Sequence, residues 1–340
     1  MILHSILLLA LAAVSPQAQQ ARIGEIDFFG TSGIDVQEVR SALPVREGEL
    51  IPEDQVSGVG DRINRAVERA IGHPATDVDF VCCDDQGRLM VYIGLGGANN
   101  AAVPHHQAPK GSPCLPKQAV TLYDGAMAAF EHAVQEGITG EDDSQGYALS
   151  KDASARAKQT AMHEYAVAHE RRLELTLESC GKAEQRQAAA GMLGYARKSA
   201  AQIAALVRAS RDLDEGVRNN AVRALWVLAM AGPKTASQIP PQSFVAMLNS
   251  GLWTDRNKAG LLLMVLTGSR SSRLLERLRT EALPSLIEMA RWHDPSHAQA
   301  YRVLLGRIAG LDETRIQQLI AGGRVEEIIA AAGNVPSRGL

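Results

Sequence analysis

In the second half of the chain, apolar residues recur at helical spacing within a repeated motif of the form Arg-x-x-Ala-x-x-x-Leu. The copies are Arg186, Ala189 and Leu193; Arg218, Ala221 and Leu225; Arg256, Ala259 and Leu263; and, with His in place of Arg, His297, Ala300 and Leu304. Residues three or four positions apart share a helix face, so the small Ala permits close approach of a neighbouring helix and the Leu fills its groove. The copies begin 32 to 41 residues apart, which is the period at which one helical hairpin stacks on the next.

The pattern around these motifs predicts paired helices. The expected pairs are a helix ending near Ser179 with 184–197, 199–211 with 216–231, 242–249 with 255–267, 271–292 with 295–310, and a final pair within 312–332 that caps the exposed end. Pro284 is expected to bend the helix at 271–292, because proline removes a backbone hydrogen bond inside a helix. An array of this kind presents an extended surface on which a partner can bind.

The first hundred residues show a different pattern. Short apolar runs at 22–30, 78–83 and 89–95 predict strands, and the last two flank a turn that contains Gly87. Helices are expected at 35–43 and 53–71, and the second carries apolar residues at three- and four-residue spacing along one stripe. The predicted order is strand, helix, helix, strand, strand.

Between these two regions the chain changes character twice. Residues 96–117 are rich in Gly and Pro with almost no periodicity, which indicates a linker, and its His105-His106 pair has no further metal ligands nearby. A helix is expected at 120–136, a loop at 137–146, and a long helix or bent pair at 152–178. The acidic triplet 141–143 lacks the alternating ligands of an EF-hand, and His163 and His169 lie on different faces of a helix, unlike a zinc-protease motif.

The N-terminus predicts export. Residues 6–14 form an apolar run too short to span a bilayer and placed like the core of a signal peptide, and no later segment is apolar enough to cross a membrane. In an exported protein one disulfide is plausible, and we expect Cys83 or its neighbour Cys82 to meet Cys114. The alternative is that the cysteines remain reduced and buried as small hydrophobic residues.

Charge is divided unevenly along the chain. Residues 1–183 carry 15 Lys and Arg against 25 Asp and Glu, whereas residues 184–340 carry 20 against 13. The densest basic cluster contains Arg270, Arg273 and Arg277, which could hold an acidic partner or pair with Glu276 and Glu281 along the helix. No aromatic residues interleave with these arginines, so nucleic-acid binding is not expected.

Two resemblances follow from these features. The strand order, with Phe29-Gly30 closing the first strand and residues 43–48 between the helices, resembles a POTRA domain over residues 22–95. That resemblance implies a sheet edge that adds a strand from a client polypeptide. From residue 169 onward, and most clearly at residues 212–225, the chain is similar to bacterial HEAT repeats, which implies that Asp214 and Arg218 cap the hairpin and pair along the stack.

The expected fold class is therefore α+β, a small βααββ POTRA-like domain followed by a mostly α-helical, HEAT-like α-solenoid. The expected segments are a signal peptide at 1–20, the POTRA-like domain at 21–96, a Pro- and Gly-rich linker at 97–118, a helical region at 119–180, and the repeats with their cap at 181–335.

No catalytic constellation, phosphate-binding loop or cofactor motif stands out in the sequence. We therefore expect an exported, periplasmic or extracellular, non-enzymatic scaffold or adaptor without cofactor or metal, which binds a protein or peptide partner through the array. One alternative is a cytoplasmic HEAT-repeat protein with nucleic-acid-binding or lyase-type activity. Another is an exported enzyme with its site built across the linker, which predicts a pocket near residues 141–147.

Overall fold

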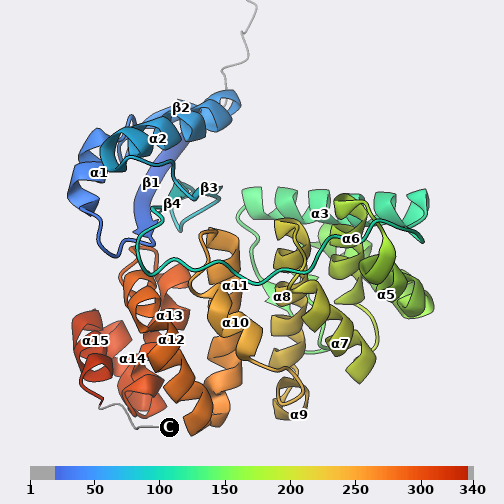
Figure 1. Cartoon of the computed structure of the whole chain (residues 1–340). Helices are drawn as coiled ribbons and strands as arrows, with labels where there is room; N and C mark the ends of the chain where they lie inside the picture. The colour runs from blue at the N-terminus through green and yellow to red at the C-terminus, as the bar shows by residue number, and fades with distance from the viewer. Residues whose placement is uncertain (1–19, 336–340) are drawn as a thin grey trace, which may run out of the picture.

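The computed structural model describes residues 20–335 and shows an α+β chain, with a small sheet and its helices followed by a long set of helices (Figure 1). Residues 1–19 of the expected signal peptide lie outside the described part. Within residues 20–335, no helix combines the length and hydropathy needed to span a bilayer.

The N-terminal sheet has four strands, where the sequence predicts three. Their order is β2 (Leu50–Pro52), β1 (Gln20–Phe29), β4 (Leu89–Gly94) and β3 (Asp77–Val81). β1 and β4 are parallel, and the other two pairs are antiparallel. The missed strand β2 is only three residues long, and it forms because the turn after α1 brings it back against the beginning of β1.

The two faces of this sheet pack against different partners. Helices α1 (Val36–Ala42) and α2 (Val56–Ile71), with the short turn η1 (Glu53–Gln55) before α2, cover one face and bury Ile26, Phe28 and Val91. The opposite face carries Phe29 and Tyr92, which belong to the same hydrophobic core as the helical region. The sheet is thus buried between its own helices and the array.

The helical region confirms the predicted helix pairs. Its elements are α3 (Lys117–Gln135), β5 (Glu141–Asp142), β6 (Leu149–Ser150), α4 (Ala153–Ala168), α5 (Glu170–Ser179), α6 (Ala183–Leu193), α7 (Ala200–Ala209), α8 (Glu215–Met230), α9 (Pro233–Ala236), α10 (Gln242–Met247), α11 (Trp253–Leu266), η2 (Thr267–Ser269), α12 (Ser272–Ala290), α13 (Pro295–Ile308), α14 (Glu313–Ala321) and α15 (Val325–Gly333). The small hairpin of β5 and β6 and the short α9 were not predicted. Pro284 lies inside α12, which continues on both sides of it.

The second helices of the pairs pack in sequence, α6 on α8, α8 on α11, α11 on α13 and α13 on α15. The Ala and Leu positions of all four motifs are buried in these helices, and they are Ala189, Leu193, Ala221, Leu225, Ala259, Leu263, Ala300 and Leu304. They therefore have the packing role that their spacing predicts.

The motif arginines link each helix pair to the next. Arg186 pairs with Asp212 at 2.7 Å, Arg218 with Asp255 at 2.9 Å, and Arg256 with Glu288 at 3.3 Å. Each guanidinium also donates a hydrogen bond to the backbone carbonyl six residues earlier, in the turn that precedes its own helix. Buried guanidinium groups need such complete pairing, because an unpaired buried charge is strongly unfavourable.

Asp214 has a separate role at the start of α8. Its side chain accepts a hydrogen bond from the backbone N–H of Val217, as an N-cap residue does. Arg218 closes the same turn through the carbonyls of Asp212 and Leu213. The two residues thus cap one hairpin, while the ion pair along the stack is made by Arg218 and Asp255.

The expected linker is bound along the helical array. We call residues 97–116 the strap; Figure 1 shows it crossing the helices before α3 begins. Backbone N–H groups of the strap donate to carbonyls in successive inter-helix turns, from Ala101 to Asn249, from His106 to Arg211 and from Gly111 to Ser179. The strap therefore meets the helix pairs in reverse sequence order, and its polar backbone is satisfied by their turns.

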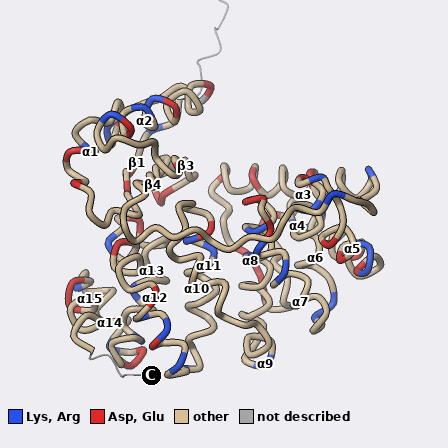
Figure 2. The backbone as a smooth tube through the Cα atoms, in the orientation of Figure 1, with Lys and Arg blue, Asp and Glu red and all other residues tan. Residues whose placement is uncertain are grey.

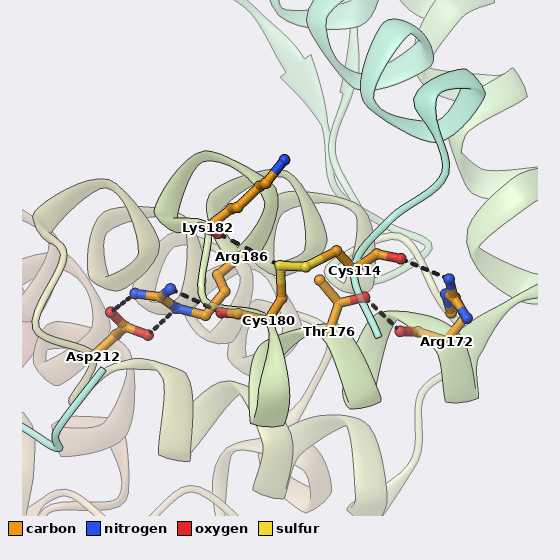
Figure 3. Close-up of a disulfide and its surroundings, with 7 residues drawn as sticks. All are labelled: Cys114, Arg172, Thr176, Cys180, Lys182, Arg186 and Asp212. Atoms are coloured by element: carbon orange, nitrogen blue, oxygen red, sulfur yellow. Dashed lines mark hydrogen bonds and ion pairs between the residues drawn. A yellow bond between two sulfur atoms is a disulfide. The ribbon is translucent and has the colours of Figure 1, made fainter. Parts of the chain in front are cut away.

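The structure corrects the expected disulfide. Cys114 is bonded to Cys180, next to the buried Arg186–Asp212 pair (Figure 3), and Cys82 is bonded to Cys83. The Cys83–Cys114 pairing was wrong because the strap carries Cys114 away from the sheet to the turn between α5 and α6.

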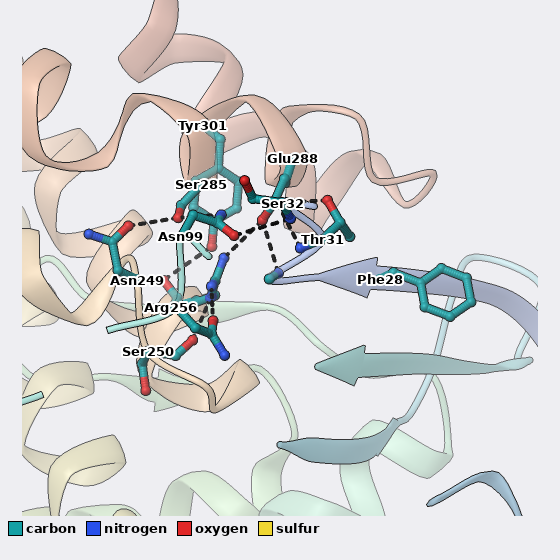
Figure 4. Close-up of polar contacts among 12 residues, drawn as sticks. Phe28, Thr31, Ser32, Asn99, Asn249, Ser250, Arg256, Ser285, Glu288 and Tyr301 are labelled. Atoms are coloured by element: carbon teal, nitrogen blue, oxygen red, sulfur yellow. Dashed lines mark hydrogen bonds and ion pairs between the residues drawn. The ribbon is translucent and has the colours of Figure 1, made fainter. Parts of the chain in front are cut away.

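Polar contacts fix the sheet on the array (Figure 4). The carboxylate of Glu288 accepts hydrogen bonds from the backbone N–H groups of Gly30 and Thr31, at 3.0 and 2.8 Å. The guanidinium of Arg256 bonds Asn100 at the start of the strap and lies 4.9 Å from the ring centroid of Phe29. A motif arginine thus joins the sheet, the strap and the array.

Candidate functional site

A cavity of about 200 Å³ lies between α3, α4, α6, α8 and the hairpin of β5 and β6. Its walls are mainly apolar and aromatic, and they are formed by Tyr123, Met127, Phe130, Tyr147, Ala148, Gln159, Met162, Gly191, Gly194, Tyr195, Asn219, Asn220, Arg223, Ala224 and Val227. Such walls suit an apolar or aromatic group, and the amides at one side can orient its polar end.

Hydrogen bonds and ring stacking hold the aromatic walls in place. The ring of Tyr147 stacks on His163 with centroids 4.2 Å apart, and His163 Nδ1 donates to the carbonyl of Tyr195 at 2.6 Å. The hydroxyl of Tyr195 donates to the carbonyl of Ala148 at 2.8 Å, and Asn220 donates to the hydroxyl of Tyr123 at 2.7 Å. The cavity is therefore preorganised.

Burial also determines the chemistry of the two buried phenols. It raises the pKa of Tyr123 and of Tyr195 above the ordinary value of 10.0. Both hydroxyls consequently remain protonated at neutral pH, and they act as hydrogen-bonding groups of the wall.

Gly191 makes room for the Tyr123 ring on the α6 side of the cavity. A Cβ atom at this position would lie 2.6 Å from Cε2 of Tyr123, which is closer than any ordinary contact. The glycine on this helix face thus permits the close approach of α3 and α6.

A group of charged side chains that interact with one another extends from the cavity wall over α8, α11, β3 and β5. Arg223 lines the cavity and pairs with Glu141 at 2.6 Å. Burial, and then the nearby positive charge of Arg223, lower the pKa of Lys258 to about 8. In the described part of the chain, the Lys258 ammonium makes no hydrogen bond or ion pair.

The edge strand β3 supplies the acidic side of this group. Burial raises the pKa of Asp79, and the negative charge of Glu215 adds to this rise. The positive charge of Lys258 partly opposes it. Burial raises the pKa of Asp77 to about 7, although its carboxylate accepts a 2.7 Å hydrogen bond from the backbone N–H of Trp253 at the start of α11. The edge strand β3 therefore lies close to the beginnings of both α8 and α11.

We refer to the cavity and this charged group together as the α8 site; the charged residues are Asp77, Asp79, Glu141, Glu215, Arg223 and Lys258. The same face of α8 carries Asn219, Trp226 and Met230 at three- and four-residue spacing, and Met230 is 49% exposed. The site therefore combines an apolar recess with an ammonium group that has no ion-pair partner among the described residues, and Met230 is an exposed apolar side chain further along the same helix face.

The residues singled out from the sequence mostly lie elsewhere. His297 contacts the sheet, with its Nδ1 2.6 Å from the hydroxyl of Tyr92. In the basic cluster, Arg270 pairs with Glu313 and Arg277 with Glu281, whereas Arg273 is exposed. Figure 2 shows both acidic and basic positions on α2, α5 and around α8, so the two signs are intermixed within single elements.

The buried Ala and Leu positions of the repeat motifs also lie outside the cavity wall. They face neighbouring helices in the core, so they support the site without lining it. These positions are Ala189 and Leu193 on α6, Ala221 and Leu225 on α8, Ala259 and Leu263 on α11, and Ala300 and Leu304 on α13.

One sequence-based expectation does coincide with the site. The enzyme alternative places a pocket near residues 141–147, and Tyr147 lines the cavity while Glu141 holds Arg223 at its rim. Lys258, Asp79, Tyr123 and Tyr195 were missed. Lys258 and Asp79 stand in unrelated local patterns, and only the docking of the sheet on the array brings them together.

No protein-family model matches the chain, and no curated protein is significantly similar to it in sequence.

Proposed function

We propose that the chain is an exported, non-enzymatic adaptor that binds a peptide segment of a partner protein at the α8 site. In this proposal, residues 169–335 act as a HEAT-like α-solenoid and the N-terminal sheet as a POTRA-like docking module. An apolar or aromatic side chain of the peptide occupies the cavity, and an acidic group of the peptide pairs with Lys258.

Lys258 is the observation that carries this proposal. A partly buried ammonium group without an ion pair is unfavourable, and its lowered pKa reflects that cost. A ligand carboxylate would supply the missing partner in surroundings where a charge-assisted hydrogen bond is strong. The apolar cavity, whose wall residue Arg223 interacts electrostatically with Lys258, offers the adjoining side chain a place to be buried.

The position of β3 supports a peptide as the ligand. β3 is an edge strand that pairs only with β4 among the described strands, and in Figure 1 it lies on the side of the sheet nearer to α3. An edge strand of this kind can hydrogen-bond an added extended segment. Backbone pairing at β3 and side-chain binding at α8 would together give affinity and specificity.

The strap shows that the array can hold an extended segment through its inter-helix turns, but the strap already occupies those turns. The face of α8 beside the strap is partly accessible, because Asn219, Arg223 and Trp226 are each partly exposed. The two disulfides support export, since such bonds persist mainly outside the cytosol.

Capture from the native cell envelope tests this function. Tagged wild-type protein, the Lys258→Gln variant and the Lys234→Gln variant are used as baits, and bound proteins are quantified by mass spectrometry. Lys234 is exposed on α9, outside the site, and serves as the matched control. We expect one partner to be retained by the wild type and Lys234→Gln and lost with Lys258→Gln; equal recovery by all three would contradict the proposal.

A further inference from the structure

We propose that Glu25, Asp27 and His293 form a binding site for a divalent transition-metal ion of the Zn²⁺ type, at the seam between the sheet and the array. β1 supplies the two carboxylates, and the turn between α12 and α13 supplies the imidazole. One candidate ligand atom from each of the three residues lies within 4.8 Å of the others. The site is separate from the α8 site and from the motif arginines.

An irregularity in β1 prepares the carboxylate pair. The pairing of β1 with β4 shifts register between Ile23 and Ile26, and both of these residues point into the core beneath α1 and α2. The extra residue of such a bulge redirects a side chain. Here the carboxylate of Glu25 comes to the same seam as that of Asp27.

An unsatisfied atom points independently to a missing ligand. Oε2 of Glu25 is buried and accepts no hydrogen bond from any described residue. Buried carboxylate oxygens are almost always hydrogen-bonded or bound to a cation, because desolvation without a partner is costly. A metal ion at this position would satisfy that oxygen.

The surrounding charges favour a cation. Asp294 is a third carboxylate near the pair, and with Asp27 it adds to the burial that raises the pKa of Glu25. The positive charges of His293 and Arg88 oppose this rise in pKa. Neither side chain donates a hydrogen bond to Oε2 of Glu25. Arg302 interacts with Asp27 and Asp294 but donates its hydrogen bonds to the carbonyls of Ala290 and Trp292.

The ligand set fits a zinc-type ion. One imidazole nitrogen and two carboxylate oxygens are three protein ligands of the kind found in open zinc sites, with a further position for water. Asp27 already accepts hydrogen bonds from Nδ1 of His293 at 2.7 Å and from its backbone N–H at 2.9 Å, which orients the ring. Coordination through Nδ1 requires the ring hydrogen to lie on Nε2 instead, and the imidazole side chain, 56% exposed, has room to adjust.

The test is calorimetric titration of the tag-free mature chain with ZnCl₂ after treatment with EDTA. We expect one saturable equivalent of zinc, and an affinity lower by at least about tenfold in Glu25→Gln and in His293→Ala. His105→Ala is the matched control, because it removes an exposed histidine from the His105-His106 pair and should bind zinc like the wild type. Circular dichroism checks that each variant is folded.

A second readout separates a site at the seam from zinc bound elsewhere. Zinc at the seam joins the sheet to the array, so it should raise the Tm of the wild type and of His105→Ala but not that of Glu25→Gln. Binding that is unchanged in both Glu25→Gln and His293→Ala, or lost only in His105→Ala, would overturn the proposal. Failure of the wild type to bind zinc saturably would overturn it as well.

Discussion

Single buried arginines carry the polar links between helix pairs. The sequence identifies these positions, because each Arg precedes its Ala and Leu at a fixed spacing. It does not identify their partners, which lie 26, 37 and 32 residues further on at Asp212, Asp255 and Glu288. These acids occupy a turn, a first helical turn and a helix end, so no single spacing in the sequence could predict them.

Replacing Arg218 by Ala should lower the free energy of unfolding by about 3–5 kcal/mol, because it leaves the carboxylate of Asp255 buried without its partner. Both side chains of this pair are 1% exposed. The control is Arg291→Ala, which breaks a solvent-exposed pair with Glu326 and should cost about 0–1 kcal/mol. Urea denaturation measures both; similar losses in the two variants would argue against the buried link.

Asp77 should make stability depend on pH. Burial raises its pKa from 3.8 to about 7, so the folded chain holds this proton more tightly than the unfolded chain. The free energy of unfolding should therefore fall as pH rises from about 4 to about 7. Asp77→Asn keeps an oxygen for the Trp253 N–H and should remove this part of the slope, making the variant more stable than the wild type above pH 7.

The measurement is urea denaturation at several pH values between 4 and 8. Asp85→Asn, at an exposed position in the turn between β3 and β4, is the control and should follow the wild type. Parallel curves for the wild type and Asp77→Asn would show that Asp77 has no raised pKa in the folded state.

At the scale of elements, long periodic segments were predictable and short extended ones were not. The helices of all five pairs begin and end within a few residues of the predicted bounds. β2, β5 and β6 have two or three residues each, too few for a pattern, and they exist because another segment supplies their hydrogen bonds. The strap has no periodicity at all, and its conformation follows from the turns that it crosses.

Removing the Cys114–Cys180 bond should destabilise the chain through the strap. The bond joins residues 66 apart, and closing a loop of this length restricts the unfolded chain by about 2–4 kcal/mol. The double variant Cys114→Ser/Cys180→Ser should therefore unfold at lower urea than the wild type. The bond between adjacent Cys82 and Cys83 closes no such loop. The stability of Cys82→Ser/Cys83→Ser against urea should therefore stay close to that of the wild type. A larger loss of stability in this variant than in Cys114→Ser/Cys180→Ser would contradict the account.

At the scale of the whole molecule, the sheet and the array share one core. Tyr92 in the centre of the sheet packs on Trp253 and Trp292, with ring centroids 5.1 and 4.9 Å away. The sequence gives one hint of this, since residues 89–95 form a continuous apolar run instead of an alternating one, as in strands buried on both faces. It does not show which segment covers the second face.

Tyr92→Ala should therefore weaken both parts of the molecule. We expect a loss of about 3–5 kcal/mol, typical of removing a large buried aromatic ring. In the wild type, unfolding followed by tryptophan fluorescence and by far-ultraviolet circular dichroism should coincide, because Trp253 and Trp292 lie in the shared core. Separate transitions in the wild type would show that the sheet and the array unfold independently.

Peptide selection on the α8 site tests the proposed function most directly. A random peptide library is selected on the wild-type chain, and the enriched peptides are measured on Met127→Glu and Ala128→Glu. These neighbours on α3 receive the same charge, but only Met127 lines the cavity, while Ala128 is exposed. We predict peptides that combine an apolar or aromatic residue with an acidic one, bound equally by Ala128→Glu and roughly tenfold or more weakly by Met127→Glu. Equal binding to both variants, or no enrichment on the wild type, would contradict peptide recognition at this site.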